Sequence, residues 1–98
     1  MTTSARTRTP RPLRIALIDA HPVVRLGLRS LFESQPPFSV VGDTSTLDAA
    51  LPVLRLCEPD VLITDTFPIP QSVLRRQPTL RVLYTFEALE HCSLARLT

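Results

Sequence analysis

Four short apolar runs rich in β-branched residues recur along the chain and predict β-strands. They lie at residues 14–19, 38–41, 60–65 and 80–85. Turn residues bound them; Glu58-Pro59, for example, precedes the third run, and an acidic residue closes it. Runs this short and this apolar are typical of strands buried on both faces, as in a parallel sheet.

Amphipathic stretches separate the runs and predict helices. The first is predicted at 22–35, because Pro22 suits a first helical turn and Pro36-Pro37 stops the helix. The residues that would form its apolar stripe are Val24, Leu28, Leu31 and Phe32. The second is expected to begin after an N-cap at Thr46, with Pro52 kinking it or delaying its start.

The remaining connections follow the same alternation. Residues 42–45 are predicted to form a turn, and further helices are predicted at 71–77 and 87–97. Strand and helix therefore alternate along the whole chain. This order predicts an α/β fold, a parallel sheet with helices on both faces.

Acidic residues close two of the predicted strands. Because the carboxyl ends of parallel strands meet at one sheet edge, Asp19 and Asp65 are expected to lie close together. Carboxylate oxygens are ligands that Mg²⁺ prefers, so the sequence predicts a magnesium site there. Each acid also has a simpler interpretation. Asp65 could be a turn residue at a strand end, and Asp19 could cap the helix that begins near Pro22.

Composition bounds the class of protein. The 98 residues suit one domain, and a hydrophobic content of 44% argues against wholesale disorder. Residues 1–12 are rich in Thr, Arg and Pro, so a disordered tail is predicted ahead of a domain at 13–98. A basic arm and a transit peptide are the alternatives for this tail. The net charge of +2 is too small to imply a nucleic-acid partner.

Other chemistry is sparse in the sequence. There is no secretory signal and no apolar run of transmembrane length, so a cytoplasmic protein with free thiols at Cys57 and Cys92 is expected. His21 precedes a proline, and a loop role is preferred to a catalytic or metal-binding one. No Ser-His-Asp arrangement, glycine-rich phosphate loop or Cys-x-x-Cys pair is present, so the chain is not expected to be an enzyme.

Four segments, taken together, resemble a known family. Leu17-Ile18-Asp19-Ala20-His21-Pro22, with Arg25 three positions after the proline, resembles the opening of response-regulator receiver domains of the LuxR/NarL-type subfamily. Residues 40–42 (Val-Val-Gly) resemble that subfamily's second strand. Residues 59–65 resemble the strand that ends in the phospho-acceptor aspartate, and 81–85 resemble the strand that ends in a switch Ser or Thr. The resemblance covers about residues 13–86.

The resemblance implies a flavodoxin-like doubly wound sheet with strand order 2-1-3-4 and the fifth strand missing. It implies that Asp65 accepts a phosphoryl group from a histidine kinase, that Thr85 acts as a switch, and that Asp19, Asp65 and the Phe67 backbone carbonyl hold Mg²⁺. The chain would then be the regulatory part of a bacterial transcriptional response regulator, with the DNA-binding effector domain absent from this chain.

The sequence departs from the family pattern in ways that support an alternative. Ala20 replaces a second acid, which should weaken Mg²⁺ binding, and the chain has no lysine to contact a phosphoryl group. Residues 80–85 would form an exposed edge strand, which favours a homodimer or another partner. The alternative is a degenerate receiver that acts as a phosphorylation-independent interaction or dimerisation module.

Overall fold

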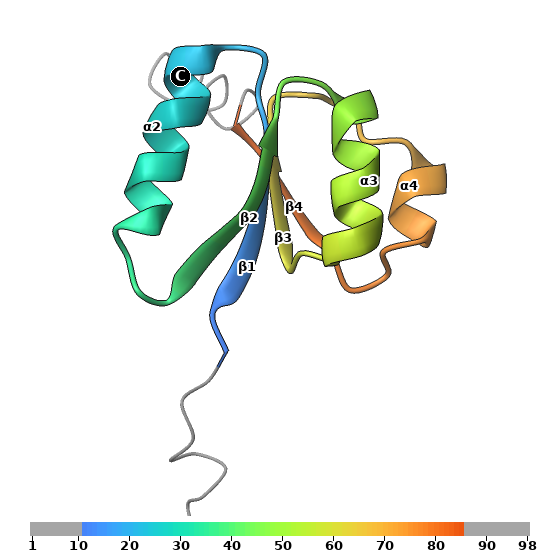
Figure 1. Ribbon diagram of the computed structural model, residues 1–98. Helices are drawn as coiled ribbons and strands as arrows, with labels where there is room; N and C mark the ends of the chain where they lie inside the picture. The colour runs from blue at the N-terminus through green and yellow to red at the C-terminus, as the bar shows by residue number, and fades with distance from the viewer. Residues whose placement is uncertain (1–10, 86–98) are drawn as a thin grey trace, which may run out of the picture.

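The computed structural model describes residues 11–85, which form a four-stranded parallel sheet flanked by helices (Figure 1). The strands are β1 (Leu13–Ile18), β2 (Phe38–Thr44), β3 (Val61–Thr64) and β4 (Arg81–Tyr84). The helices are α2 (Pro22–Glu33), α3 (Leu47–Cys57) and α4 (Gln71–Arg75). The helix predicted at 87–97 and the first ten residues of the predicted tail lie outside the described range.

The strand order is β2-β1-β3-β4, which confirms the predicted flavodoxin-like arrangement. Helix α2 covers one face of the sheet, and α3 and α4 cover the other (Figure 1). β1 lies between β2 and β3, so it has a neighbour on each side. None of the helices in the described part is long and apolar enough to cross a membrane.

The core has two layers because successive side chains of a strand point to opposite faces. Ala16 and Ile18 of β1 belong to the cluster under α3 and α4, whereas Ile15 and Leu17 belong to the cluster under α2. All four are at most 2% exposed. Burial on both faces explains why residues 15–18 form an unbroken apolar run in the sequence.

β2 is longer than predicted, because residues 42–44 continue the strand instead of turning. The pairing with β1 shifts register between Ile15 and Ala16, so that Ile15 faces Val40 and Ala16 faces Gly42. The shift inserts one extra residue, as a β-bulge does. A Cβ at Gly42 would lie 2.7 Å from Val53 Cγ1, so α3 rests directly on the backbone of this glycine.

Helix α2 begins at Pro22, as predicted, but ends at Glu33. The predicted apolar stripe is only partly correct. Leu28 and Phe32 pack on the core, while Val24 is 43% exposed and Leu31 54% exposed. The helix packs on β1 and β2 at one side of the sheet, so only a narrow face of it is covered.

Helix α3 begins directly after Thr46, whose Oγ1 accepts a hydrogen bond from Ala49 N at 3.2 Å. This confirms the predicted N-cap and shows that Pro52 does not delay the start. Glu58 ends the helix in a left-handed conformation with φ 46°, and its N–H donates to Leu54 O at 3.2 Å. Cys57, the last residue of the helix, has a free thiol and is half-buried.

Candidate functional site

The carboxyl ends of β1 and β3 bring Asp19 and Asp65 to one edge of the sheet. The backbone fixes both positions, because Asp19 N donates to Thr44 O at 3.0 Å and Asp65 N donates to Ile18 O at 3.1 Å. Each acid is thereby tied to the neighbouring strand. The predicted meeting of the two acids is observed: Asp19, Asp65 and His21 each offer a ligand atom, and these atoms lie within 4.8 Å of one another.

The Asp19 carboxylate is the buried member of the group, with 5% of its side chain exposed. Its Oδ1 accepts a hydrogen bond from His21 N at 2.8 Å and lies 3.0 Å from His21 Nδ1. Its Oδ2 accepts no hydrogen bond from any residue between 11 and 85. Asp19 does not cap α2 as the simpler interpretation predicted, because the N-cap is His21 and the helix has no side-chain cap hydrogen bond. Asp19 bonds the backbone of that N-cap residue and keeps one oxygen for a further partner.

The Asp65 carboxylate is more accessible, with 20% of its side chain exposed. Its Oδ2 accepts a hydrogen bond from Ala20 N at 3.2 Å and lies 3.8 Å from His21 Nδ1. Its Oδ1 receives no hydrogen bond within the described part of the chain. Two carboxylates and an imidazole this close together fit a divalent cation, because each offers a ligand atom to the same point.

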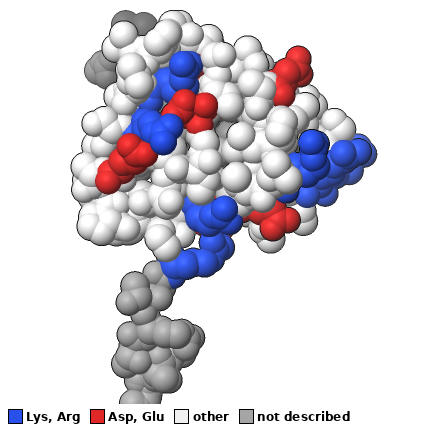
Figure 2. Space-filling model, viewed as in Figure 1, with Lys and Arg blue, Asp and Glu red and all other residues white. Residues whose placement is uncertain are grey.

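Two arginines of α2 tie this helix to its surroundings: Arg25 contacts the end of β1 and Asp43 of β2, and Arg29 contacts Asp43. Arg25 Nη1 donates to Asp19 O at 2.6 Å, and Arg25 Nε lies 3.6 Å from Asp43 Oδ1. Arg29 bridges Asp43 and Glu33, and these carboxylates, Asp43 foremost, raise the pKa of its guanidinium. Figure 2 shows basic and acidic atoms interleaved on this side of the molecule. The network ties α2 to β2 and fixes the backbone of Asp19.

The loop after β3 is anchored to β4. The rings of Phe67 and Tyr84 meet edge to face at a centroid distance of 4.8 Å, and Tyr84 Oη accepts a hydrogen bond from Ile69 N at 3.2 Å. Thr64 Oγ1 accepts from Thr66 N at 2.9 Å. Phe67 therefore lies in the loop between β3 and α4, while the metal-ligand role of its carbonyl stays a prediction.

Thr85 follows β4 at the same edge of the sheet. Thr64 and Tyr84 are register partners, so Thr85 lies one residue beyond the pair, as Asp65 does on β3. Its Oγ1 donates to Thr64 O at 3.4 Å. The hydroxyl is thus bonded to the strand that carries Asp65, and its switch role stays a prediction.

Sequence reasoning missed three residues of this site. A loop role was preferred for His21, which the structure places in the cluster. Arg25 was named only for its match to the family pattern, without a role, and its side chain is only 21% exposed. Tyr84 was considered only as a strand residue, yet it anchors the loop. A usable signal existed for His21, because a residue two positions after a strand-end acid can fold back onto it.

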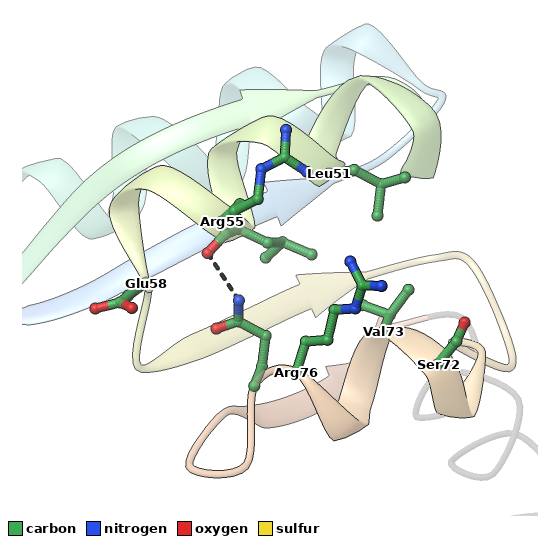
Figure 3. A pocket seen from close by; sticks show the side chains of 8 residues that line it. Leu51, Arg55, Glu58, Ser72, Val73 and Arg76 are labelled. Atoms are coloured by element: carbon green, nitrogen blue, oxygen red, sulfur yellow. Dashed lines mark hydrogen bonds between the residues drawn. The ribbon is translucent and has the colours of Figure 1, made fainter.

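A hollow of about 360 Å³ lies between α3 and α4 (Figure 3). Its apolar lining includes Leu51, Leu54 and Val73, and Arg55 and Arg76 flank it. Gln77 Nε2 donates to Leu54 O at 3.0 Å across it. None of the predicted site residues lines this hollow, so it is separate from the carboxylate cluster.

Comparison with curated proteins finds bacterial response regulators. A nitrate/nitrite response regulator protein homolog of Haemophilus influenzae is 40% identical over 53 residues, which are 54% of this chain and 26% of that protein. The DNA-binding transcriptional activator DevR/DosR of Mycobacterium tuberculosis is 31% identical over 78 residues, or 72% of this chain and 36% of that protein. The aligned part of the chain thus spans between 26% and 36% of the length of these two relatives. No family model matches.

Comparison with solved structures finds receiver domains. The signal receiver domain of a NarL response regulator from Mycobacterium tuberculosis has a TM-score of 0.64 and 25% identity, over 76% of this chain and 66% of that one. A LuxR-family two-component response regulator from Aurantimonas has a TM-score of 0.63 and 30% identity, over 74% and 57%. The homologues are NarL/LuxR-type response regulators, as the sequence resemblance implied.

Proposed function

We propose that this chain, which shares the receiver fold and detectable sequence similarity with NarL/LuxR-type response regulators, is the regulatory domain of a two-component phosphorelay and accepts a phosphoryl group on Asp65. One observation carries the proposal. The Asp65 carboxylate is partly exposed at the carboxyl end of β3, beside the buried Asp19 and His21. Ligands of open parallel sheets bind at this edge.

Asp65 has the features of a nucleophile. Ala20 N holds Oδ2, which orients the carboxylate, and Oδ1 has no donor among residues 11–85. In the proposed step an Asp65 oxygen attacks phosphorus, the new O–P bond forms, and the bond from phosphorus to the donor's nitrogen or oxygen breaks. The leaving group departs with that electron pair. A fixed nucleophile of this kind contributes mainly through positioning.

A divalent cation would be held by Asp19 and Asp65, with the Phe67 carbonyl as a proposed backbone ligand. When bound, it would neutralise charge on the transferring phosphoryl oxygens. The chain's own residues keep the site in shape: Arg25 Nη1 holds the Asp19 backbone, and the backbone of Asp65 is bonded to β1. Ala20 supplies only its N–H, so we expect Mg²⁺ to bind weakly.

The conformational change caused by phosphorylation would be transmitted through β4. Thr85 Oγ1 would exchange its bond to Thr64 O for one to the phosphoryl group, which would move the end of β4. Tyr84 lies next to Thr85 and holds the Phe67 loop, so the movement would reach that loop. We propose a histidine kinase as the phosphoryl donor and a DNA-binding effector domain, outside this chain, as the regulated partner.

One observation favours a second candidate, a degenerate receiver that only binds a partner. The position that would carry another acid is Ala20, which contributes no side-chain oxygen to the cluster. The chain also contains no lysine. Within residues 11–85, β4 pairs with β3 alone, and a free strand edge can pair with another chain.

Intact-mass measurement after incubation with acetyl phosphate and MgCl₂ tests the proposal. We expect one phosphoryl adduct on the parent chain and none on Asp65→Asn. Asp48→Asn is the matched control, because it removes a carboxylate from the exposed start of α3 and should leave the adduct unchanged. A folded parent chain that carries no adduct would contradict phosphorylation and support the partner-binding candidate.

A further inference from the structure

We propose that His21 is a direct ligand of the metal at this site, and that the site therefore selects a first-row transition ion such as Co²⁺ or Zn²⁺ over Mg²⁺. The inference rests on the proposed function, because it assigns the metal of the same site. It concerns which ion the cluster of Asp19, His21 and Asp65 binds.

One ring nitrogen of His21 faces both carboxylates. His21 Nδ1 lies 3.0 Å from Asp19 Oδ1 and 3.8 Å from Asp65 Oδ2. An imidazole that served only as a helix cap would need to face one acceptor. Here one nitrogen lies near carboxylates that follow two different strands, close enough for all three groups to bind one ion.

The backbone places the ring there. His21 precedes Pro22 and is extended, with φ −94° and ψ 110°, in the region to which a following proline restricts it. Its N–H donates to Asp19 Oδ1 at 2.8 Å, so the backbone folds back onto the same carboxylate as the ring. The side chain is 74% exposed, so Nε2 can stay protonated in solvent while Nδ1 binds metal.

The buried carboxylate needs a cation. Asp19 is 95% removed from solvent at its side chain, yet its Oδ2 has no donor among the described residues. A buried charge is tolerated when it is paired or coordinates a metal. Arg25 contacts only the Asp19 backbone oxygen, so it does not supply the pairing charge to the carboxylate.

The donor set decides which ion binds best. Mg²⁺ requires oxygen ligands, whereas imidazole suits Zn²⁺, Co²⁺, Ni²⁺ and Cu²⁺. Two carboxylates and one imidazole give a mixed set of oxygen and nitrogen ligands, and Ala20 adds no oxygen ligand from its side chain. We therefore expect Co²⁺ to bind about tenfold or more tightly than Mg²⁺.

The test is calorimetric titration of the full chain with CoCl₂ and, separately, MgCl₂. The variants are His21→Ala and Asp65→Asn, with Val23→Ala as the matched control because Val23 is 81% exposed and near the same helix start. We expect His21→Ala to weaken Co²⁺ binding about tenfold or more and to change Mg²⁺ binding less than about twofold. The visible absorption of bound Co²⁺ should shift in His21→Ala and stay unchanged in Val23→Ala.

The outcomes separate this inference from the proposed function. If Asp65→Asn weakens both ions while His21→Ala leaves Co²⁺ binding and its spectrum unchanged, the metal site stands and the His21 assignment is wrong. If the parent chain binds neither ion, the assignment is also wrong, and His21 is only an ion-pair partner of the acids. If His21→Ala weakens Co²⁺ binding but acetyl phosphate gives no adduct, the assignment stands and phosphorylation fails. Circular dichroism confirms that each variant is folded.

Discussion

Asp60 and Asp65 flank the two ends of β3, and they differ in how many of their carboxylate oxygens accept hydrogen bonds. Asp60 Oδ2 accepts from Arg14 N at 2.8 Å, and Oδ1 accepts from Arg11 Nη2 at 2.9 Å, so both oxygens are used. Asp65 keeps one oxygen without a donor in the described part of the chain. The first carboxylate joins β1 to the start of β3, and the second is left available for chemistry.

The Asp60 contacts predict a pH-dependent contribution to stability. The Arg14 N–H, and then Arg11, hold the pKa of this carboxyl below its usual value. A lowered folded-state pKa stabilises the protein above the unfolded-state pKa of about 4, and this stabilisation is lost as the pH falls through the folded-state value. Asp60→Asn should therefore unfold at lower urea than the parent at pH 7, and the difference should shrink at pH 3.

Urea midpoints at the two pH values check this prediction. Asp48→Asn is the control, since Asp48 accepts no hydrogen bond from another side chain or backbone group within residues 11–85, and it should keep the pH dependence of the parent. An equal gap between parent and Asp60→Asn at pH 7 and pH 3 would contradict the assignment.

The sequence predicted elements well where local pattern decides them. β1 and β3 are apolar on both faces, and Thr46 has a cap geometry that depends only on the next three residues. The errors arose where distant partners decide. The end of β2 depends on its register with β1, and the exposure of Val24 and Leu31 depends on which strands α2 covers.

In the candidate site, too, some features could be predicted from the sequence and others depend on distant contacts. Strand ends and parallel topology sufficed to bring Asp19 and Asp65 together, because both acids follow directly from the sheet. The participation of His21 and Arg25 depends on how the loop before α2 turns back onto Asp19, which is a matter of side-chain rotamers and hydrogen bonds. No pattern of apolar and polar positions encodes those contacts.

At the scale of elements, the contact between β2 and α3 means that alanine should have opposite effects on stability at Gly42 and at Gly27. Gly42 lies under Val53, whose Cγ1 would be 2.7 Å from an added Cβ, and a β-branched side chain in a helix cannot easily turn away. Gly42→Ala should destabilise the protein by about 1–3 kcal/mol. Gly27→Ala in α2 meets nothing within 4 Å and should stabilise it by about 1 kcal/mol.

Thermal and urea unfolding of the two alanine variants measure this difference. The double variant Gly42→Ala/Val53→Ala removes the clash and should be less destabilised than the sum of its single changes predicts. Strictly additive effects would show that the added methyl group does not meet Val53.

At the scale of the whole molecule, the central strand β1 is shielded from solvent more completely than the border strand β4. β1 pairs with a strand on each side, and residues 15–18 are at most 2% exposed. β4 pairs with β3 alone among the described strands, and Leu83 is 53% exposed. Backbone amides should therefore differ in protection across the sheet.

Hydrogen exchange followed residue by residue tests this order. We expect the amides of Ile15–Ile18 to exchange slowest, and those of β4 to exchange faster. Equal protection of β1 and β4 in the isolated chain would mean that another segment or a second chain covers β4, and would favour the partner-binding candidate.

The central place of β1 has a consequence for biosynthesis. The strand that ends up between two neighbours is made before either of them, and β3 is complete only when Thr64 has been added, 46 residues after Ile18. At about 5–20 residues per second, β1 lacks the second of its two neighbours for roughly 2–9 s, although β2 is complete earlier, at Thr44. Until β3 has been made, the edge of β1 that β3 covers has no strand partner, and slower translation would lengthen that interval.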